Sequence, residues 1–287
     1  MTGRHLLLGS ILLLGGAGAL WASAPRPAPE AAPPVPQRIV SMNLCVDQLL
    51  IALADRGQIA GLTRNAADPG MSAAADAARG LPLLVHSAEQ ILVTDPDLIV
   101  GMPATGNAAL AALPGQDYRL LDLGLANSLG EIHASIRQTA AAVGHPGRGE
   151  ALIAGMEREL AGLPRPGRGR VAAYYQRRGY MTGTGTLVDD LMTRLGLVNL
   201  AGKLGKPVLS QLSLEEMVAA EPDFLIVEHG TDIIDDQGSE MLHHPALRDI
   251  SRIGIAQAWT VCGGPAYTSA ARSIAAQIRR HDAGERP

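Results

Sequence analysis

The chain has 287 residues, 47% of them hydrophobic and 18% charged, so it can bury a substantial core and is not a disordered chain. Its 24 Lys and Arg residues against 28 Asp and Glu residues give a net charge of −4, which argues against a nucleic-acid-binding protein with a basic face. Two cysteines are too few for a disulfide-built scaffold or a four-cysteine zinc site.

Residues 1–24 have the pattern of a secretory signal peptide. Arg4 precedes the apolar stretch Leu6–Leu20, and the small residues Ala22–Ala24 form a cleavage pattern. The apolar stretch is shorter than the roughly 20 residues that a spanning helix needs, so cleavage is favoured over an uncleaved membrane anchor. Residues 25–36 are rich in proline and alanine and are expected to be an extended linker.

An N-terminal α/β lobe is predicted over residues 37–145, because apolar strand patterns alternate with helical ones. The predicted strands are Arg38–Met42, Ile59–Leu62, Leu98–Gly101 and Tyr118–Leu121, and the predicted helices are Val46–Ala54 and Leu129–Val143. Residues 146–166 follow as the spine segment, with one long helix predicted over Gly147–Leu163, since Leu152, Met156, Leu160 and Leu163 recur at helical spacing. This helix would be about 25 Å long and would join two lobes stiffly.

A C-terminal α/β lobe is predicted over residues 167–287. Its predicted strands are Arg170–Tyr175, Phe224–Glu228 and Ala258–Val261, and its predicted helices are Thr186–Leu195, Leu214–Ala220 and Thr268–Arg280. The predicted fold class is therefore α/β, with two Rossmann-like lobes of mostly parallel sheets joined by the spine helix.

An internal repeat supports the two-lobed architecture. Ser87–Val100 resembles Ser213–Ile226, and matched residues lie 126 positions apart throughout. Each copy begins with a capping-box pattern and continues through a short helix, a Pro-Asp turn and an apolar strand. Helix–turn–strand units look alike in many α/β proteins, but the shared spacing favours common descent of the two lobes.

Arg38–Met42, the two repeat units and the linking helix together resemble the helical-backbone periplasmic binding proteins. That family serves ATP-driven importers of ferric siderophores, haem and vitamin B12. The resemblance covers roughly residues 37–281 and implies a ligand cleft between the lobes, periplasmic location, and delivery to an ABC permease with its ATPase. It also implies that Glu89 and Glu215, one per lobe, contact arginines of the permease. The alternative is that each glutamate only stabilises its own helix, because a carboxylate in the first turn interacts favourably with the positive end of the helix dipole.

Ligands of open parallel sheets bind beyond the carboxyl ends of the strands, and this rule nominates the lining of the cleft. The candidate ligand-binding residues are Asn43, Cys45, Arg64, His86, Tyr175, Arg177, Tyr180, His229, Cys262 and Tyr267, and the same rule also includes their neighbours Leu44, Asn65, Gln176, Arg178 and Gly183. Aromatic and arginine side chains suit a large planar or anionic ligand. His86 and His229 could coordinate haem iron or a bare metal, but the sequence does not identify a metal site.

Cys45 and Cys262 fall in different lobes, at positions that point toward the cleft. An oxidising compartment favours a disulfide between them, which requires Cα atoms within about 7 Å. Two free thiols, or a pair of soft ligands at the site, are the alternatives.

The predicted function is capture of an iron chelate, either a siderophore or haem, by a monomeric protein that needs no cofactor of its own. Cobalamin is the alternative cargo, although few large aromatics are available to contact it. A periplasmic enzyme is a weaker alternative, because the chain lacks the G-x-S-x-G, Walker and HExxH patterns. A periplasmic scavenger is a further weak alternative.

Overall fold

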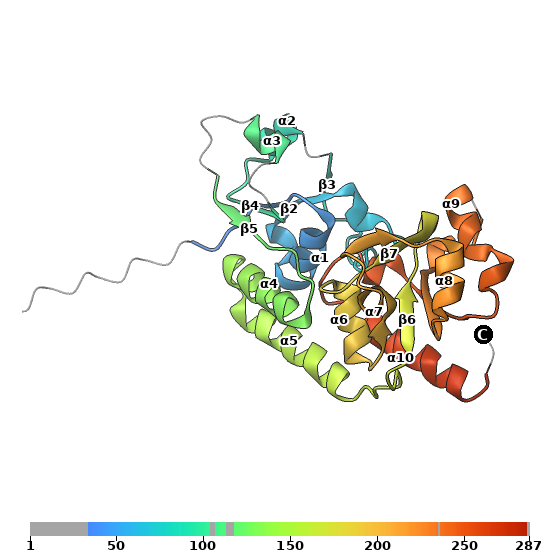
Figure 1. The fold of residues 1–287 in the computed structure, drawn as a ribbon. Helices are drawn as coiled ribbons and strands as arrows, with labels where there is room; N and C mark the ends of the chain where they lie inside the picture. The colour runs from blue at the N-terminus through green and yellow to red at the C-terminus, as the bar shows by residue number, and fades with distance from the viewer. Residues whose placement is uncertain (1–33, 86, 104–106, 113–117, 235, 286–287) are drawn as a thin grey trace, which may run out of the picture. The chain divides into compact units, whose positions relative to one another are not determined.

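Two parallel β-sheets flanked by helices, with one further antiparallel pair of strands, form the described part of the chain (Figure 1). The structure is a computed structural model that describes residues 34–85, 87–103, 107–112, 118–234 and 236–285. The predicted signal peptide and most of the predicted linker lie outside these residues. From Val35 onward the chain forms one compact unit.

The N-terminal lobe contains a five-stranded sheet in the order β3-β2-β1-β4-β5, and every neighbouring pair is parallel. The strands are β1 (Ile39–Ser41), β2 (Ile59–Thr63), β3 (Leu83–Leu84), β4 (Leu98–Gly101) and β5 (Leu120–Asp122). The helices are α1 (Leu44–Leu53), α2 (Ala88–Thr94), α3 (Ala108–Ala111) and α4 (Leu129–Ala142). Because parallel strands need crossovers, helices connect most of these strands.

The C-terminal lobe contains a parallel sheet in the order β11-β10-β6-β8 and a separate antiparallel pair, β7-β9. The strands are β6 (Val171–Tyr174), β7 (Tyr180–Thr182), β8 (Val198–Asn199), β9 (Leu209–Gln211), β10 (Phe224–Glu228) and β11 (Ser251–Ile255). The helices are α6 (Leu187–Arg194), α7 (Leu200–Lys203), α8 (Leu214–Ala220), α9 (Gln237–Glu240) and α10 (Tyr267–Asp282).

The sequence repeat corresponds to the α2–β4 and α8–β10 units, which occupy the same place in the two sheets. Ser87 and Ser213 cap their helices by accepting from the backbone N–H three residues later. The residues that end the two helices, Asp95 and Glu221, both have φ of 46°. β4 pairs with β1 as β10 pairs with β6, so the two lobes have matching central strands.

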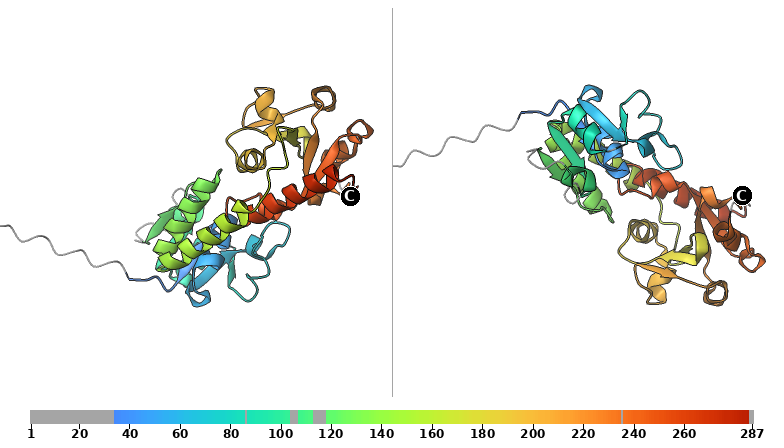
Figure 2. Two further views of the ribbon diagram at one scale, coloured as in Figure 1. Left: turned by 90° about the horizontal axis from the view of Figure 1, so that it is seen from below. Right: turned by 90° about the horizontal axis from the view of Figure 1, so that it is seen from above.

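One long helix, α5 (Pro146–Ala161), joins the lobes. Figure 2 shows it running from beside α4 toward α10, and it contacts both helices. Ile153, Met156 and Leu160 on its inner face belong to a continuous hydrophobic core that includes residues of both lobes. The fold is thus the predicted α/β architecture with two lobes and a helical connection.

The predicted strand over Ala258–Val261 is wrong. The strand that pairs with β10 is β11, in a parallel register that runs from Phe224 opposite Ser251 to Glu228 opposite Ile255. Residues Gln257–Trp259 form a short 3₁₀ helix instead. In β11 only Ile253 and Ile255 are buried, and Arg252 and Gly254 between them weaken the apolar signal that identifies a strand.

Candidate functional site

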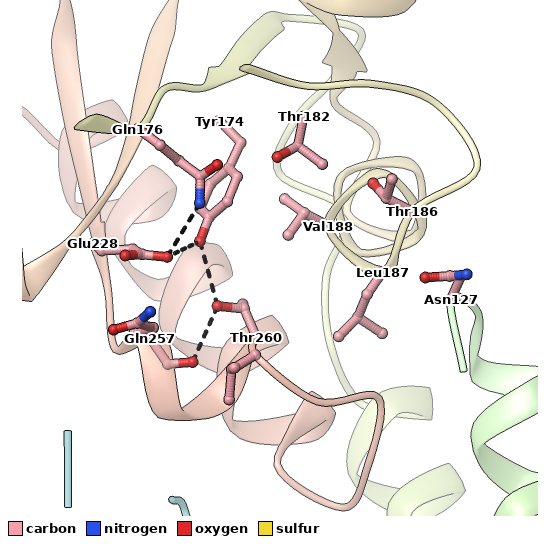
Figure 3. Close-up of a pocket in the computed structure, with 11 residues that line it drawn as sticks. Asn127, Tyr174, Gln176, Thr182, Thr186, Leu187, Val188, Glu228, Gln257 and Thr260 are labelled. Carbon is pink, nitrogen blue, oxygen red and sulfur yellow. Dashed lines mark hydrogen bonds between the residues drawn. The ribbon is translucent and has the colours of Figure 1, made fainter. Parts of the chain in front are cut away.

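A cavity of about 270 Å³ lies beyond the carboxyl ends of β6 and β10, where ligands of parallel sheets bind (Figure 3). Residues of both lobes line it. The N-terminal lobe contributes Asn127, and the C-terminal lobe contributes Tyr174, Gln176, Thr182, Thr186, Leu187, Val188, Glu228, Gln257, Thr260 and Val261.

A hydrogen-bonded polar cluster forms one wall of this cavity. The Tyr174 hydroxyl donates to Glu228 Oε1 at 2.6 Å, and Gln176 Nε2 donates to the same oxygen at 3.4 Å. Figure 3 shows these side chains converging on Glu228, with Thr260 beside the tyrosine hydroxyl. Burial and then the Glu228 charge raise the pKa of Tyr174 far above its usual value, so the phenol stays protonated.

Tyr175, nominated as a ligand contact, does not line the cavity. Successive residues of a strand face opposite sides of the sheet, so the neighbour of Tyr174 points the other way. Tyr175 is fully buried in a second core cluster with Met181 and Met217. Its hydroxyl donates to the Leu212 carbonyl at 2.8 Å, so the side chain is bonded within the core.

Tyr267, also nominated as a ligand contact, is buried at the first residue of α10. Its hydroxyl donates to the Asp190 carboxylate and accepts from Arg194 Nε at 3.1 Å. These bonds join α10 to α6. Its nomination depended on the predicted strand over Ala258–Val261, which the structure does not have, and the side chain turns into the core.

The other nominated side chains that the structure describes lie outside the cavity lining. Asn43 caps α1 by accepting from the Val46 N–H, and Arg177 forms an ion pair with Asp236. His229 lies 3.4 Å from Asp232 and is more than half exposed. Arg64 and Tyr180 are exposed, at a 3₁₀ turn and at the start of β7. His86 lies outside the described residues.

Cys45 and Cys262 form a disulfide with Cα atoms 5.3 Å apart. Cys45 lies in the first turn of α1 and Cys262 directly follows Val261 of the cavity lining. The backbones of the two lobes also meet here, because a Cβ on Gly263 would lie 2.0 Å from the Ala126 carbonyl oxygen. The lobes are therefore joined covalently and in close contact at the edge of the cavity.

Glu89 and Glu215 occupy matched, exposed positions in the first turns of α2 and α8. A hydrogen bond with Ser87, and then the backbone N–H of Glu89, lower the pKa of Glu89 below its usual value. Glu89 is thus a charged group at neutral pH.

In the part of the chain that the structure describes, His, Cys, Asp and Glu side chains do not gather in a group of three or more that could hold a metal ion. Among the described helices, none is both long and apolar enough to span a membrane.

Sequence reasoning found Gln176 but missed most of the lining. Glu228 is the last residue of β10, so the strand-end rule applied equally to this position. Thr186 is the N-cap of α6, a recognisable signal that marks where the helix begins but not that it faces a cavity. Asn127 lies in the loop that follows β5, and nothing in the local sequence distinguishes it from other loop residues.

A family model described as "Periplasmic binding protein" matches residues 39–251. No curated protein matches the chain in sequence.

Several solved structures are similar along almost their whole length. The haem-binding protein RhuT from Roseiflexus sp. RS-1 is 26% identical with a TM-score of 0.65, covering 84% of this chain and 99% of that protein. A periplasmic haem-binding protein from Pseudomonas aeruginosa is 19% identical with a TM-score of 0.67, covering 85% and 92%. The vitamin B12 binding protein BtuF of Vibrio cholerae is 15% identical with a TM-score of 0.63, covering 86% and 98%.

Proposed function

The chain belongs to the periplasmic binding protein family, and from this premise we propose that it captures an iron chelate, either a siderophore or haem, and delivers it to an ABC permease. The observation that carries this proposal is the cavity at the strand ends, which is lined by residues of both lobes. A ligand held there contacts both lobes at once, so its binding can be transmitted to the whole molecule.

The similar structures support the class of cargo. Two of them are named as haem-binding proteins, and one from Saccharomonospora viridis is named as part of a Fe³⁺-hydroxamate transport system. Cobalamin is the second candidate, because uncharged amides and hydroxyls line much of the cavity and BtuF is named for vitamin B12. Binding is non-covalent in either case.

Lobe movement on binding is small. The disulfide and the close contact of Gly263 with Ala126 hold the two lobes together beside the cavity. α5 shares its buried face with the core of both lobes, which makes it a stiff connection. A short rotation about this joined edge is enough to admit and release a ligand.

Delivery uses Glu89 and Glu215 as paired contacts with arginines of the permease and its ATPase complex. Their exposure and their matched positions in the two lobes support this role. Charge-assisted bonds between glutamate and arginine would steer docking and set its register. The protein acts as a monomer in the periplasm after its signal peptide, residues 1–24, has been removed.

Fluorescence of Trp259 provides a direct test. The chain has two tryptophans, Trp21 and Trp259, and removal of residues 1–24 leaves only Trp259. Trp259 lies between the cavity-lining residues Gln257 and Thr260. Titration with a ferric hydroxamate, a ferric catecholate, haemin, cobalamin and zinc should give saturable quenching with one class of chelate.

Thermal melting with the same compounds is the independent measurement. A ligand at 100 times its dissociation constant adds about 2.7 kcal/mol to stability, which raises the melting temperature by several degrees. If no compound quenches Trp259 and none raises the melting temperature, the proposed function is wrong.

A further inference from the structure

We propose that Glu228 selects for chelates that present a positive charge or hydrogen-bond donors to the cavity, and against anionic chelates. This inference rests on the proposed function and narrows its substrate class. Trihydroxamates with a free ammonium group, and neutral chelates bearing amide N–H groups, belong to the selected class. Catecholates and haem, which carry carboxylates or phenolates, belong to the disfavoured class.

The charges of the lining are the first reason. Glu228 is the only ionisable carboxyl among the described residues that line the cavity, and none of those residues is Lys, Arg or His. Arg177, which follows Gln176 in the chain, forms an ion pair with Asp236 instead. An anionic ligand would therefore meet a negative carboxylate with no cation in the lining to offset it.

The direction of the hydroxyl protons is the second reason. The Tyr174 proton is donated to Glu228 Oε1 at 2.6 Å, and the Thr186 proton is donated to the Gly183 carbonyl at 2.9 Å. The Thr260 proton has two acceptors within reach, the Gln257 carbonyl at 3.3 Å and the Tyr174 oxygen at 3.4 Å. These hydroxyls therefore offer lone pairs rather than protons to a ligand.

The geometry of Glu228 is the third reason. Both described bonds to its carboxylate, from Tyr174 and Gln176, reach the same oxygen, Oε1. Burial, followed by the charge of Glu228, raises the pKa of Tyr174 far above its usual value, so the phenol keeps the proton that it donates to Oε1. Among the described residues no donor to Oε2 is seen, and a carboxylate oxygen with free lone pairs binds ammonium and amide N–H groups well.

A matched pair of ligands isolates this effect. Ferrioxamine B is a ferric trihydroxamate with a free ammonium group, and its N-acetyl derivative is the same chelate without that charge. The wild-type protein is titrated with both, and with cobalamin, a ferric tris-catecholate and haemin, by quenching of Trp259. We expect a cationic or neutral donor-bearing chelate to bind most tightly, with ferrioxamine B tighter than its acetylated form.

Glu228→Gln removes the charge but keeps the size and a carbonyl oxygen. We expect it to lower the affinity for the most tightly bound chelate by roughly tenfold or more, because hydrogen bonds to charged groups are stronger than those between neutral groups. Glu240→Gln is the matched control, since Glu240 is exposed at the end of α9 and outside the lining. It should leave every affinity as in the wild type.

Gln257→Lys provides a second variant, which keeps both Tyr174 and Glu228 and adds a cation to the lining. Figure 3 shows Gln257 beside Glu228, so a lysine there should offset the charge of the carboxylate, lower the affinity for ferrioxamine B and raise that for the catecholate. Melting temperatures of all variants verify that each is folded.

The inference is overturned if the catecholate or haemin binds the wild type most tightly, or if Glu228→Gln changes the affinity of the best ligand by less than about twofold. In both of those results a chelate still binds, so the proposed function stands. Binding of none of the compounds overturns the proposed function itself, and this inference with it.

Discussion

At the scale of the residue, Tyr174 at the end of β6 and its neighbour Tyr175 have different surroundings, because successive residues of an extended chain point to opposite faces of a sheet. Tyr174 lines the cavity and bonds to Glu228. Tyr175 packs in the second core, and burial, followed by the charges of Glu215 and Glu216, raises its pKa to about 12. One of two identical side chains therefore lines the cavity, and the other packs in the core.

Tyr175→Phe tests this division. Loss of the hydroxyl leaves the Leu212 carbonyl without its donor, so we expect the free energy of unfolding to fall by about 1 to 2 kcal/mol. Ligand affinity should not change, because the side chain faces away from the cavity. Urea denaturation and Trp259 titration measure the two quantities. A large loss of affinity at wild-type stability would show that Tyr175 contacts the ligand after all.

Asp236 is the residue whose ionisation should be visible in stability against pH. The backbone N–H of Ser239 and then the Arg177 guanidinium lower its pKa from 3.8 to about 2. A pKa that is lower in the folded state adds stability above the unfolded pKa, and that stability disappears as the pH falls through the folded pKa.

We therefore expect Asp236→Asn to flatten the dependence of melting temperature on pH between about 4 and 2. Asp249→Asn, at a side chain that is 91% exposed, is the control and should follow the wild type. Identical pH profiles for Asp236→Asn and wild type would contradict the prediction.

At the scale of the element, the two repeat units show why one sequence pattern recurs. In each, a serine begins the helix, a residue at φ 46° ends it, and an aspartate follows the proline. Asp97 accepts from the backbone N–H of Arg38 at 2.9 Å, and the matching Asp223 accepts from that of Val171 at 2.7 Å. The aspartate of each Pro-Asp turn therefore ties the start of the neighbouring strand to the unit.

The Ser213 hydroxyl caps α8 by accepting from the Glu216 N–H at 3.2 Å, and Ser213→Ala removes this cap. We expect a loss of about 1 kcal/mol in the free energy of unfolding. Ser87→Ala, at the matched cap of α2, should cost a similar amount. Urea denaturation compares the two variants with wild type. Unchanged midpoints for both would mean that neither cap stabilises its helix.

At the scale of the whole molecule, the lobes are held together by α5, by the shared core, and by the Cys45–Cys262 disulfide with the close contact of Gly263 and Ala126 beside it. The disulfide joins residues 217 positions apart, so it restricts a long loop of the unfolded chain. It also lies beside the cavity wall at Val261, so it limits how far the lobes can separate there.

Cys45→Ser with Cys262→Ser should lower the free energy of unfolding by about 2 to 4 kcal/mol. Reductant should lower the melting temperature of the wild type and leave that of the double variant unchanged. Alkylation and mass measurement before and after reduction verify the bond. Equal melting temperatures of wild type with and without reductant, despite full reduction, would contradict the prediction.

Glu89→Ala with Glu215→Ala tests delivery rather than capture. Both side chains are exposed and outside the cavity lining, so ligand affinity should remain as in the wild type. Uptake of the bound chelate by cells should fall strongly because the charge-assisted contacts with the permease are lost. Glu240→Gln is the control for a lost surface charge. Normal uptake by the double variant would exclude the docking role.

Much of the fold was predictable because it depends on short-range patterns. Apolar runs and caps located β4, β10 and α8 at the residues where the structure has them, and the repeat indicated two similar lobes. The β7-β9 pair was not predictable, since antiparallel pairing of two short strands separated by two helices leaves no local signal. β11 was missed for a related reason, because pairing with β10 rather than its own pattern makes it a strand.

The binding site depended on tertiary structure to a greater degree. Sequence alone predicted a ligand site beyond the strand ends, and it predicted two lobes with a linking helix. Only the folded chain decided that Tyr174 rather than Tyr175 faces the cavity, and that Asn127 of the other lobe completes it. The physical reason is that a side chain's direction depends on the exact end of its strand and on what packs against each face, and both are set by contacts between distant residues.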